Sequence, residues 1–301
     1  MVGTRQRKNY VRFLLFISFF PQLIQGPINR YGEMAPQLTA RHIWNWERTK
    51  RALFLFLFGA MKKYAIANLT APTIAAILDG NDPKLAGSMA LLAILLYSLQ
   101  QYADFSGGID MVLGVAQLYG IEMMPNFRQP YFSTSLGDFW RRWHITLSGW
   151  FRDYIYIPLG GNRKGQARQL LNMFLVWAAT GIWHGASWNF IAWGLYYFVL
   201  LTIEKTFLLK YLKKGKVWPH IYTLFFVVLG WASLRPTSPA HRWVCCCKSC
   251  LCPRAAFRPC TTCAITVCCW CWAVSARPRC RTGCGRKSAK ILWQSSLCLP
   301  C

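Results

Sequence analysis

The chain has 301 residues, of which 54 % are hydrophobic, 16 % aromatic and only 15 % charged, and its formal net charge is +25. This composition excludes an ordinary soluble domain. Several uncharged runs approach the roughly 20 residues that cross a bilayer, so the sequence predicts an all-α, polytopic membrane protein. The basic residues flank apolar runs and form no separate patch, which disfavours a nucleic-acid partner.

The first apolar run, Phe13–Asn29, is uncharged but interrupted by two prolines and a glycine. No small-residue cleavage site follows it, so we expect a broken or re-entrant helix buried in protein and not a signal peptide. The next stretch, Arg30–Arg51, resembles an interfacial segment, with Trp44 and Trp46 as anchors at the membrane surface.

Two further apolar runs, Ala52–Met61 and Tyr64–Leu78, are separated only by Lys62 and Lys63. They form either one long helix with snorkelling lysines or two shorter helices, and the sequence does not decide. Leu85–Ala103 has 19 residues without a charge and predicts a spanning helix.

A polar stretch with Gly107, Gly108 and two acids follows that helix, and Met111–Gly120 then predicts a separate short helix. Acids at this depth are costly in lipid. Asp104 and Asp110 therefore face a polar cavity, or Asp104 lies at the surface where the helix ends.

The central stretch predicts one interfacial helix from Leu136 to about Ile157. Ser135 and Asp138 have the spacing of a capping box, and Asp138 with Arg142 forms an i, i+4 pair. One face of this helix is aromatic and the other is rich in arginine, which is typical of a helix in the membrane interface. His144 falls on the aromatic face.

The run Gln169–Ile203 is too long for one helix and predicts two, turning near Gly185. His184 would then lie at the end of the first. Val217–Leu234 predicts a last spanning helix.

The sequence changes character at Arg235. All 14 cysteines and no acid lie beyond this point. Two Cys-x-x-Cys pairs, at Cys247 and Cys260, resemble a zinc framework, but nine residues are a short separation for a zinc ribbon. We predict that residues 235–301 are a frameshifted, unstructured tail and that residues 1–234 form the functional core, with no metal site.

Several segments of the core resemble the membrane-bound O-acyltransferase family, in the bacterial branch with the alginate O-acetyltransferase membrane subunit and the teichoic-acid D-alanylation subunit. The resemblance implies a partial family core at 1–234 whose N-terminal helices are missing. The segments that carry it, in the family order, are Phe19–Tyr31, Tyr102–Asp110, Asn126–Tyr131, Phe139–Ser148, Trp150–Asn162 and Trp183–Gly185.

The resemblance implies an enzyme of the plasma or inner membrane, multi-pass, that moves an acyl group, most simply acetyl, to hydroxyls of an extracellular or cell-wall polysaccharide. It implies no bound cofactor and a donor such as acetyl-CoA or another acyl thioester. It also implies membrane lipid as surroundings, and a periplasmic or extracellular partner acyltransferase that passes the group to the polysaccharide acceptor.

The resemblance also places His184 at the catalytic histidine of the family and His144 at its second histidine. Neutral imidazole suits a general base near pH 7, although an isolated histidine beside an apolar run is often a satisfied core residue. The arginines could attract a donor phosphate or only form a solvated face. Further candidates for substrate binding are Asp104, Asp110, Arg141, Arg142, Trp143, Arg152, Asp153, Asn162 and Trp183.

Two other functions compete with acyl transfer. A non-enzymatic component of polysaccharide or lipid export would also explain broken helices and buried acids. The chain could also be an inactive, truncated fragment of the acyltransferase.

Overall fold

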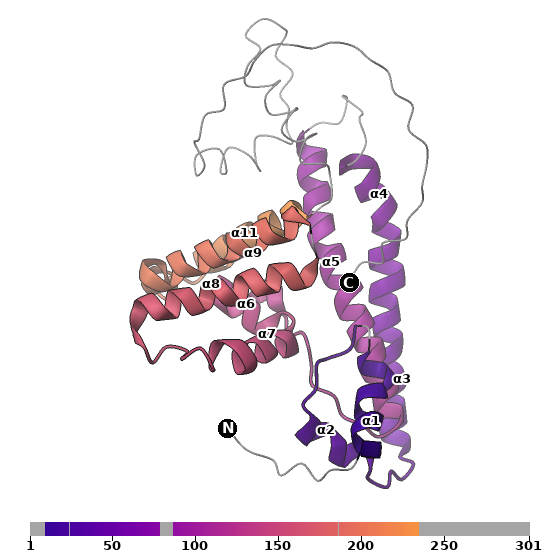
Figure 1. Cartoon of the computed structure of the whole chain (residues 1–301). Helices are drawn as coiled ribbons and strands as arrows, with labels where there is room; N and C mark the ends of the chain where they lie inside the picture. The colour runs from indigo at the N-terminus through magenta and orange to yellow at the C-terminus, as the bar shows by residue number, and fades with distance from the viewer. Residues whose placement is uncertain (1–9, 24, 79–86, 186, 235–301) are drawn as a thin grey trace, which may run out of the picture.

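The computed structural model describes residues 10–23, 25–78, 87–185 and 187–234, and the described chain is helical without a named strand. The all-α prediction is therefore confirmed. Helices α3, α4 and α5 form one upright group, and α6 to α9 with α11 lie across it (Figure 1). The Cys-rich tail and its Cys-x-x-Cys pairs lie outside the described residues.

The N-terminal part is broken as predicted, but the expected burial in protein does not hold for its first helix, α1 (Tyr10–Ser18), in which no residue is buried. Helix α1 ends before a 3-10 turn, η1 (Phe20–Gln22), in which Pro21 has no N–H to continue the helix. Helix α2 (Tyr31–Leu38) follows after an irregular stretch. In that stretch the N–H of Ile28 donates to Thr146 Oγ1 at 3.0 Å, so the N-terminal segment docks on the central stretch.

The two apolar runs around the lysine pair form one helix. It consists of α3 (Trp46–Ala60), a π-helical stretch η2 (Met61–Asn68) and α4 (Leu69–Leu78). The lysines do not snorkel to a surface. Lys62 Nζ lies 2.5 Å from Asp110 Oδ2 and Lys63 Nζ lies 2.6 Å from Asp104 Oδ1, so both bind the neighbouring helix.

That neighbour, α5 (Gly87–Leu118), is one continuous helix, and the prediction of two helices around a polar break is wrong. The glycine pair serves close packing instead. A Cβ on Gly107 would lie 2.7 Å from the carbonyl oxygen of Gly59, too close for any side chain. Asp104 and Asp110 consequently face lysines across this contact, and neither a polar cavity nor a free helix end surrounds them.

The central interfacial helix is also broken, so the prediction of one helix is wrong here too. Helix α6 (Leu136–Arg142) and α7 (Ile145–Phe151) are separated by Trp143 and His144, and π-helical η4 (Arg152–Tyr156) follows. His144 has the left-handed φ of 49°. The predicted start is confirmed, because Ser135 Oγ accepts the N–H of Asp138 at 3.0 Å, and Arg142 pairs with Asp138 at 3.0 Å.

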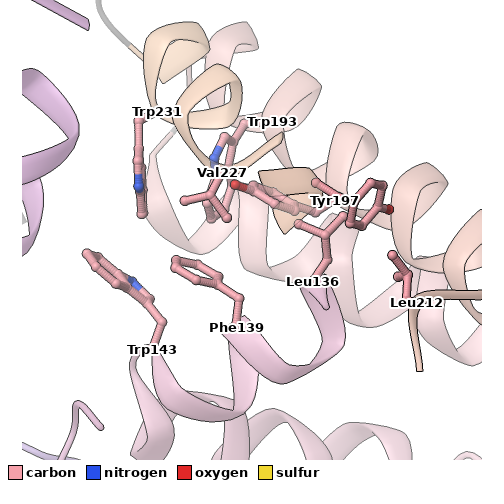
Figure 2. Packing of buried hydrophobic residues seen from close by; sticks show 9 residues of the cluster. Leu136, Phe139, Trp143, Trp193, Tyr197, Leu212, Val227 and Trp231 are labelled. Carbon is pink, nitrogen blue, oxygen red and sulfur yellow. The ribbon is translucent and has the colours of Figure 1, made fainter. Parts of the chain in front are cut away.

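The predicted helical pair beyond Gln169 is confirmed. Helix α8 (Gly165–His184) turns into α9 (Trp188–Ile203), which continues through η5 (Glu204–Leu208) and α10 (Leu209–Leu212). Helix α11 (Trp218–Leu234) packs beside α9. A buried aromatic cluster joins α6, α9 and α11 (Figure 2), with Leu136, Phe139, Trp143, Trp193, Tyr197, Leu212, Tyr222, Val227 and Trp231 at its centre.

By length and hydropathy, two helices in the described part of the chain can cross a bilayer, Trp46–Leu78 and Trp188–Leu212, and Trp218–Leu234 is a shorter apolar helix. The predicted span Leu85–Ala103 is not among them, and it begins two residues before the described part of α5. These helices fit the membrane class that the composition predicts.

The lysine–aspartate pairs yield a stability prediction. Lys62→Met leaves the Asp110 carboxylate without its cation between α3 and α5, which we expect to cost on the order of 3 kcal/mol. The double variant Lys62→Met/Asp110→Leu removes both charges and should recover most of that loss. Reversible unfolding in detergent measures both. Equal stability of the single variant and the unmodified chain would contradict the prediction.

Candidate functional site

A cavity of about 510 Å³ lies where three parts of the chain meet. Its walls come from the N-terminal segment at Ile28–Glu33, from the central stretch 137–153 and from α8. Both predicted histidines, His144 and His184, line it. The cavity therefore brings together residues that are 40 positions apart in the sequence.

His144 enters the cavity because the helix breaks at its position. Its side chain is 6 % exposed, and its ring lies 4.9 Å from the ring of Phe105 on α5. The ring Nδ1 is buried and has no hydrogen-bond partner among the described residues. Burial, and then the proximity of His184, lower the pKa of His144 to about 3, so the imidazole is neutral at pH 7.

Three neighbouring backbone and side-chain contacts hold this break. The N–H of Ile145 donates to the carbonyl of Asn126 at 3.0 Å, and Asn126 Oδ1 accepts from the N–H and the hydroxyl of Thr146 at 3.1 and 2.9 Å. Asn126 is fully buried. Its part in orienting His144 was not predicted, although Asn126 begins one of the motifs that carry the resemblance.

His184 ends α8 and lies half-buried against aromatic rings. Its ring centroid is 5.1 Å from Trp193 of α9 and 5.0 Å from Trp183, whose ring is also 6.1 Å from His144. The following Gly185 has φ 155°, and a Cβ there would lie 2.9 Å from the ring of Phe190. Glycine is therefore required for the sharp turn that places His184 at the cavity.

Charged side chains gather around Asp153, a second part of the cavity wall. Asp153 accepts from Arg30 at 2.6 Å and from Arg152 at 2.8 Å. Arg30 also lies over the ring of Tyr154, 4.9 Å from its centroid. Arg30 was not among the predicted site residues, and only the motif Phe19–Tyr31 pointed to its segment.

The structure brings six of the eleven predicted site residues to the cavity and leaves five outside its lining. Asp104 and Asp110 pair with lysines of η2, and Arg142 pairs with Asp138. Helical spacing predicted the pair of Arg142 with Asp138 but not the lysine partners of Asp104 and Asp110. The six residues at the cavity are His144, His184, Arg141, Trp143, Arg152 and Asp153.

The remaining two lie on the outside of the site. Asn162 Oδ1 accepts the hydroxyl of Tyr156, in the turn before α8. Trp183 is 53 % exposed but touches both histidine rings from the side. Its position suggests support for the histidines more than contact with a substrate.

The arrangement has the parts of a proton-transfer site. Two imidazoles share one largely apolar cavity. A neutral imidazole can accept a proton, and the low pKa of His144 makes that ring a weak acceptor, which leaves His184 as the candidate base. Trp140 Nε1 beside the cavity is buried without a partner among the described residues, which leaves a second unused donor close to the histidines. Within the same residues, no three His, Cys, Asp or Glu side chains gather as a metal site.

Comparison with known proteins matches residues 2–229 to the model of the membrane-bound O-acyltransferase family. The peptidoglycan O-acetyltransferase of Helicobacter pylori is 38 % identical over 75 % of this chain and 44 % of its own length. A probable alginate O-acetylase, AlgI, of Pseudomonas fluorescens is 38 % identical over 77 % of this chain and 46 % of its own length.

A more distant relative is the teichoic acid D-alanyltransferase of Bacillus subtilis, 32 % identical over 73 % of this chain and 60 % of its own length. The chain spans about half the length of the curated relatives it matches.

The pKa of His144 yields a pH prediction. Unfolding returns this histidine to its ordinary pKa of 6.5, so the unfolded chain binds a proton that the folded chain rejects between pH 6.5 and about 3. The contribution of the neutral His144 to the free energy of unfolding is fully present above pH 6.5 and is lost progressively as the pH falls toward 3. Lowering the pH from 7.5 to 5 should therefore reduce the free energy of unfolding by about 2 kcal/mol through this histidine.

The free energy of unfolding is measured at both pH values for the unmodified chain and for His144→Asn. The pH dependence that the unmodified chain shows and His144→Asn lacks is the contribution of His144. His42→Asn, at an exposed histidine, is the matched control. The same pH dependence with and without His144 would contradict the assignment.

Proposed function

Because the chain belongs to the membrane-bound O-acyltransferase family, we propose that its protein transfers an acyl group, acetyl in the simplest case, to hydroxyls of an extracellular or cell-wall polysaccharide. The observation that carries the proposal is the single cavity lined by both His144 and His184. The activities of the relatives supply the class of reaction, and residues able to perform it line the cavity.

In the proposed reaction His184 is the general base. It removes the proton of the acceptor hydroxyl while the hydroxyl oxygen attacks the carbonyl carbon of an acyl thioester. The carbon–sulfur bond breaks, the thiol leaves with a proton, and an ester forms. His184 suits this task because it ends α8 and its side chain lines the cavity.

His144 is proposed to orient or polarise one reactant. Its neutral ring and the unpartnered indole N–H of Trp140 offer hydrogen bonds in an apolar setting, where such bonds are strong. Arg141, Arg152 and Arg30 at the cavity wall offer positive charge to an anionic donor such as acetyl-CoA. No cofactor needs to stay bound for this chemistry.

The proposed setting is the plasma or inner membrane, with several passes. The apolar helices are consistent with membrane lipid as the surroundings. A periplasmic or extracellular partner acyltransferase would carry the group onward to the polymer. The competing export function would explain the broken helices and the buried acids, but Asp104 and Asp110 pair with lysines outside the cavity lining.

Substitution of the base tests the proposal. In the full-length protein, His184→Ala should lower acetyl transfer to the polymer by about 10²–10⁴-fold, because the hydroxyl then loses its proton acceptor. His144→Ala should lower it less. Ester-bound acetate on the purified polymer measures the transfer, with protein amount in the membrane fraction as a check on folding.

His42→Ala serves as the control, because this exposed histidine lies outside the cavity lining and its loss should leave transfer unchanged. Near-normal transfer by His184→Ala would remove the proposal.

A further inference from the structure

Glu204, at the end of α9, is a buried acid without an ion pair. Glu204 is only 4 % exposed to solvent. Among the described residues, no Lys or Arg forms an ion pair with its carboxylate. Arg141 acts on the carboxylate electrostatically but lies beyond ion-pair distance. A buried carboxylate in this situation depends on strong hydrogen bonds.

The bonds come from the backbone of another helix. Glu204 Oε2 accepts the N–H of Leu136 at 2.7 Å and Oε1 accepts the N–H of Gly137 at 2.9 Å. These N–H groups begin α6, where a helix has no internal acceptors and carries partial positive charge. A Cβ on Gly137 would lie 3.1 Å from Glu204 Oε1, so glycine lets the carboxylate approach.

The same two helices also meet at a second place, next to His184. Trp193 of α9 lies 5.5 Å from the ring of Trp140 on α6 and 5.1 Å from the ring of His184. Trp193 and Glu204 are about 16 Å apart along the helix, at about 1.5 Å per residue. Helix α6 is therefore attached to α9 in two ways, by the ring of Trp140 and by the hydrogen bonds that its first N–H groups donate to Glu204.

The aromatic contacts hold the body of α6, where Phe139 packs on Trp231 and Trp140 on Trp193, and Glu204 adds a hydrogen-bonded anchor at the start of this helix. His144 follows α6 after a single residue, and His184 leads into α9 through a short turn. The angle between α6 and α9 consequently sets the separation of the two imidazoles. Gly137, which bonds to Glu204, itself lines the cavity.

We infer that Glu204 is a positioning residue that holds His144 and His184 at their working separation by binding the first two N–H groups of α6. The inference rests on the proposed function for its catalytic consequence. Glu204 touches no reacting atom and acts only through the backbone of α6.

Glu204→Gln in the full chain tests this role. Glutamine offers one acceptor oxygen in place of two, so one N–H of α6 is left unpaired. We expect kcat for acetyl transfer to fall about 10- to 100-fold, as for a small misplacement of catalytic groups, with KM within about twofold. NMR of labelled histidine rings should show shifted resonances for His144 and His184 and an unchanged resonance for His42.

A matched control is Asn45→Ala, which removes a comparable cap from α3, where Asn45 Oδ1 accepts the N–H of Arg48 at 3.0 Å. Its histidine resonances and transfer should be unchanged. Glu204→Asp keeps the charge and both oxygens on a shorter side chain, so its kcat and its histidine shifts should lie between those of the unmodified chain and Glu204→Gln. This variant keeps the test possible if Glu204→Gln does not fold.

Unshifted His144 and His184 resonances in a folded Glu204→Gln or Glu204→Asp protein would overturn the inference, as would equal shifts in Asn45→Ala. If the unmodified full-length protein shows no acetyl transfer, the proposed function fails. The positioning role of Glu204 is then still decided by the ring resonances of His144 and His184.

Discussion

The break between α6 and α7 is the constraint on which the site depends. A buried backbone that leaves a helix must find other partners for its N–H and C=O groups. Residues 126–128 provide them: the N–H of Arg128 donates to the carbonyl of Arg142, and the carbonyl of Asn126 accepts from Ile145, both at 3.0 Å. The left-handed conformation of His144 is stable only beside this segment, and it turns the imidazole into the cavity.

Aromatic packing holds the second histidine in place. Trp140 meets Trp177, Trp193 and Tyr197 edge to face, with centroids 4.8 to 5.5 Å apart. Such contacts prefer particular ring orientations, so the cluster is more directional than aliphatic packing. Glycines at 181 and 194 let α8 and α9 approach closely, because a Cβ at either would meet backbone oxygen within 2.7 Å. The hairpin that carries His184 is thereby rigid.

The interior charges of this apolar protein share one role, which is to join segments far apart in the sequence. Lys62 and Lys63 bind α5, and Arg30 binds Asp153 across 123 positions. Glu204 binds the start of α6 in the same way. A charge in an apolar setting is tolerated when it is paired or fully hydrogen-bonded, and the pairing then specifies which elements meet. Acids that look like substrate ligands in the sequence can therefore be structural.

The sequence by itself determined the helical membrane class, the helical pair around Gly185, the cap at Ser135 and the two histidines, because these follow from local runs, spacing and motifs. It did not determine the continuity of α5, since the pair Gly107–Gly108 is locally typical of a helix break, whereas in the fold Gly107 packs against Gly59. Nor did it show the break at His144, where the helical periodicity is overridden by hydrogen bonds that Ile145 and Thr146 donate to Asn126. Only the tertiary structure decided which charges face the cavity, because ion pairs form between residues that no local pattern connects.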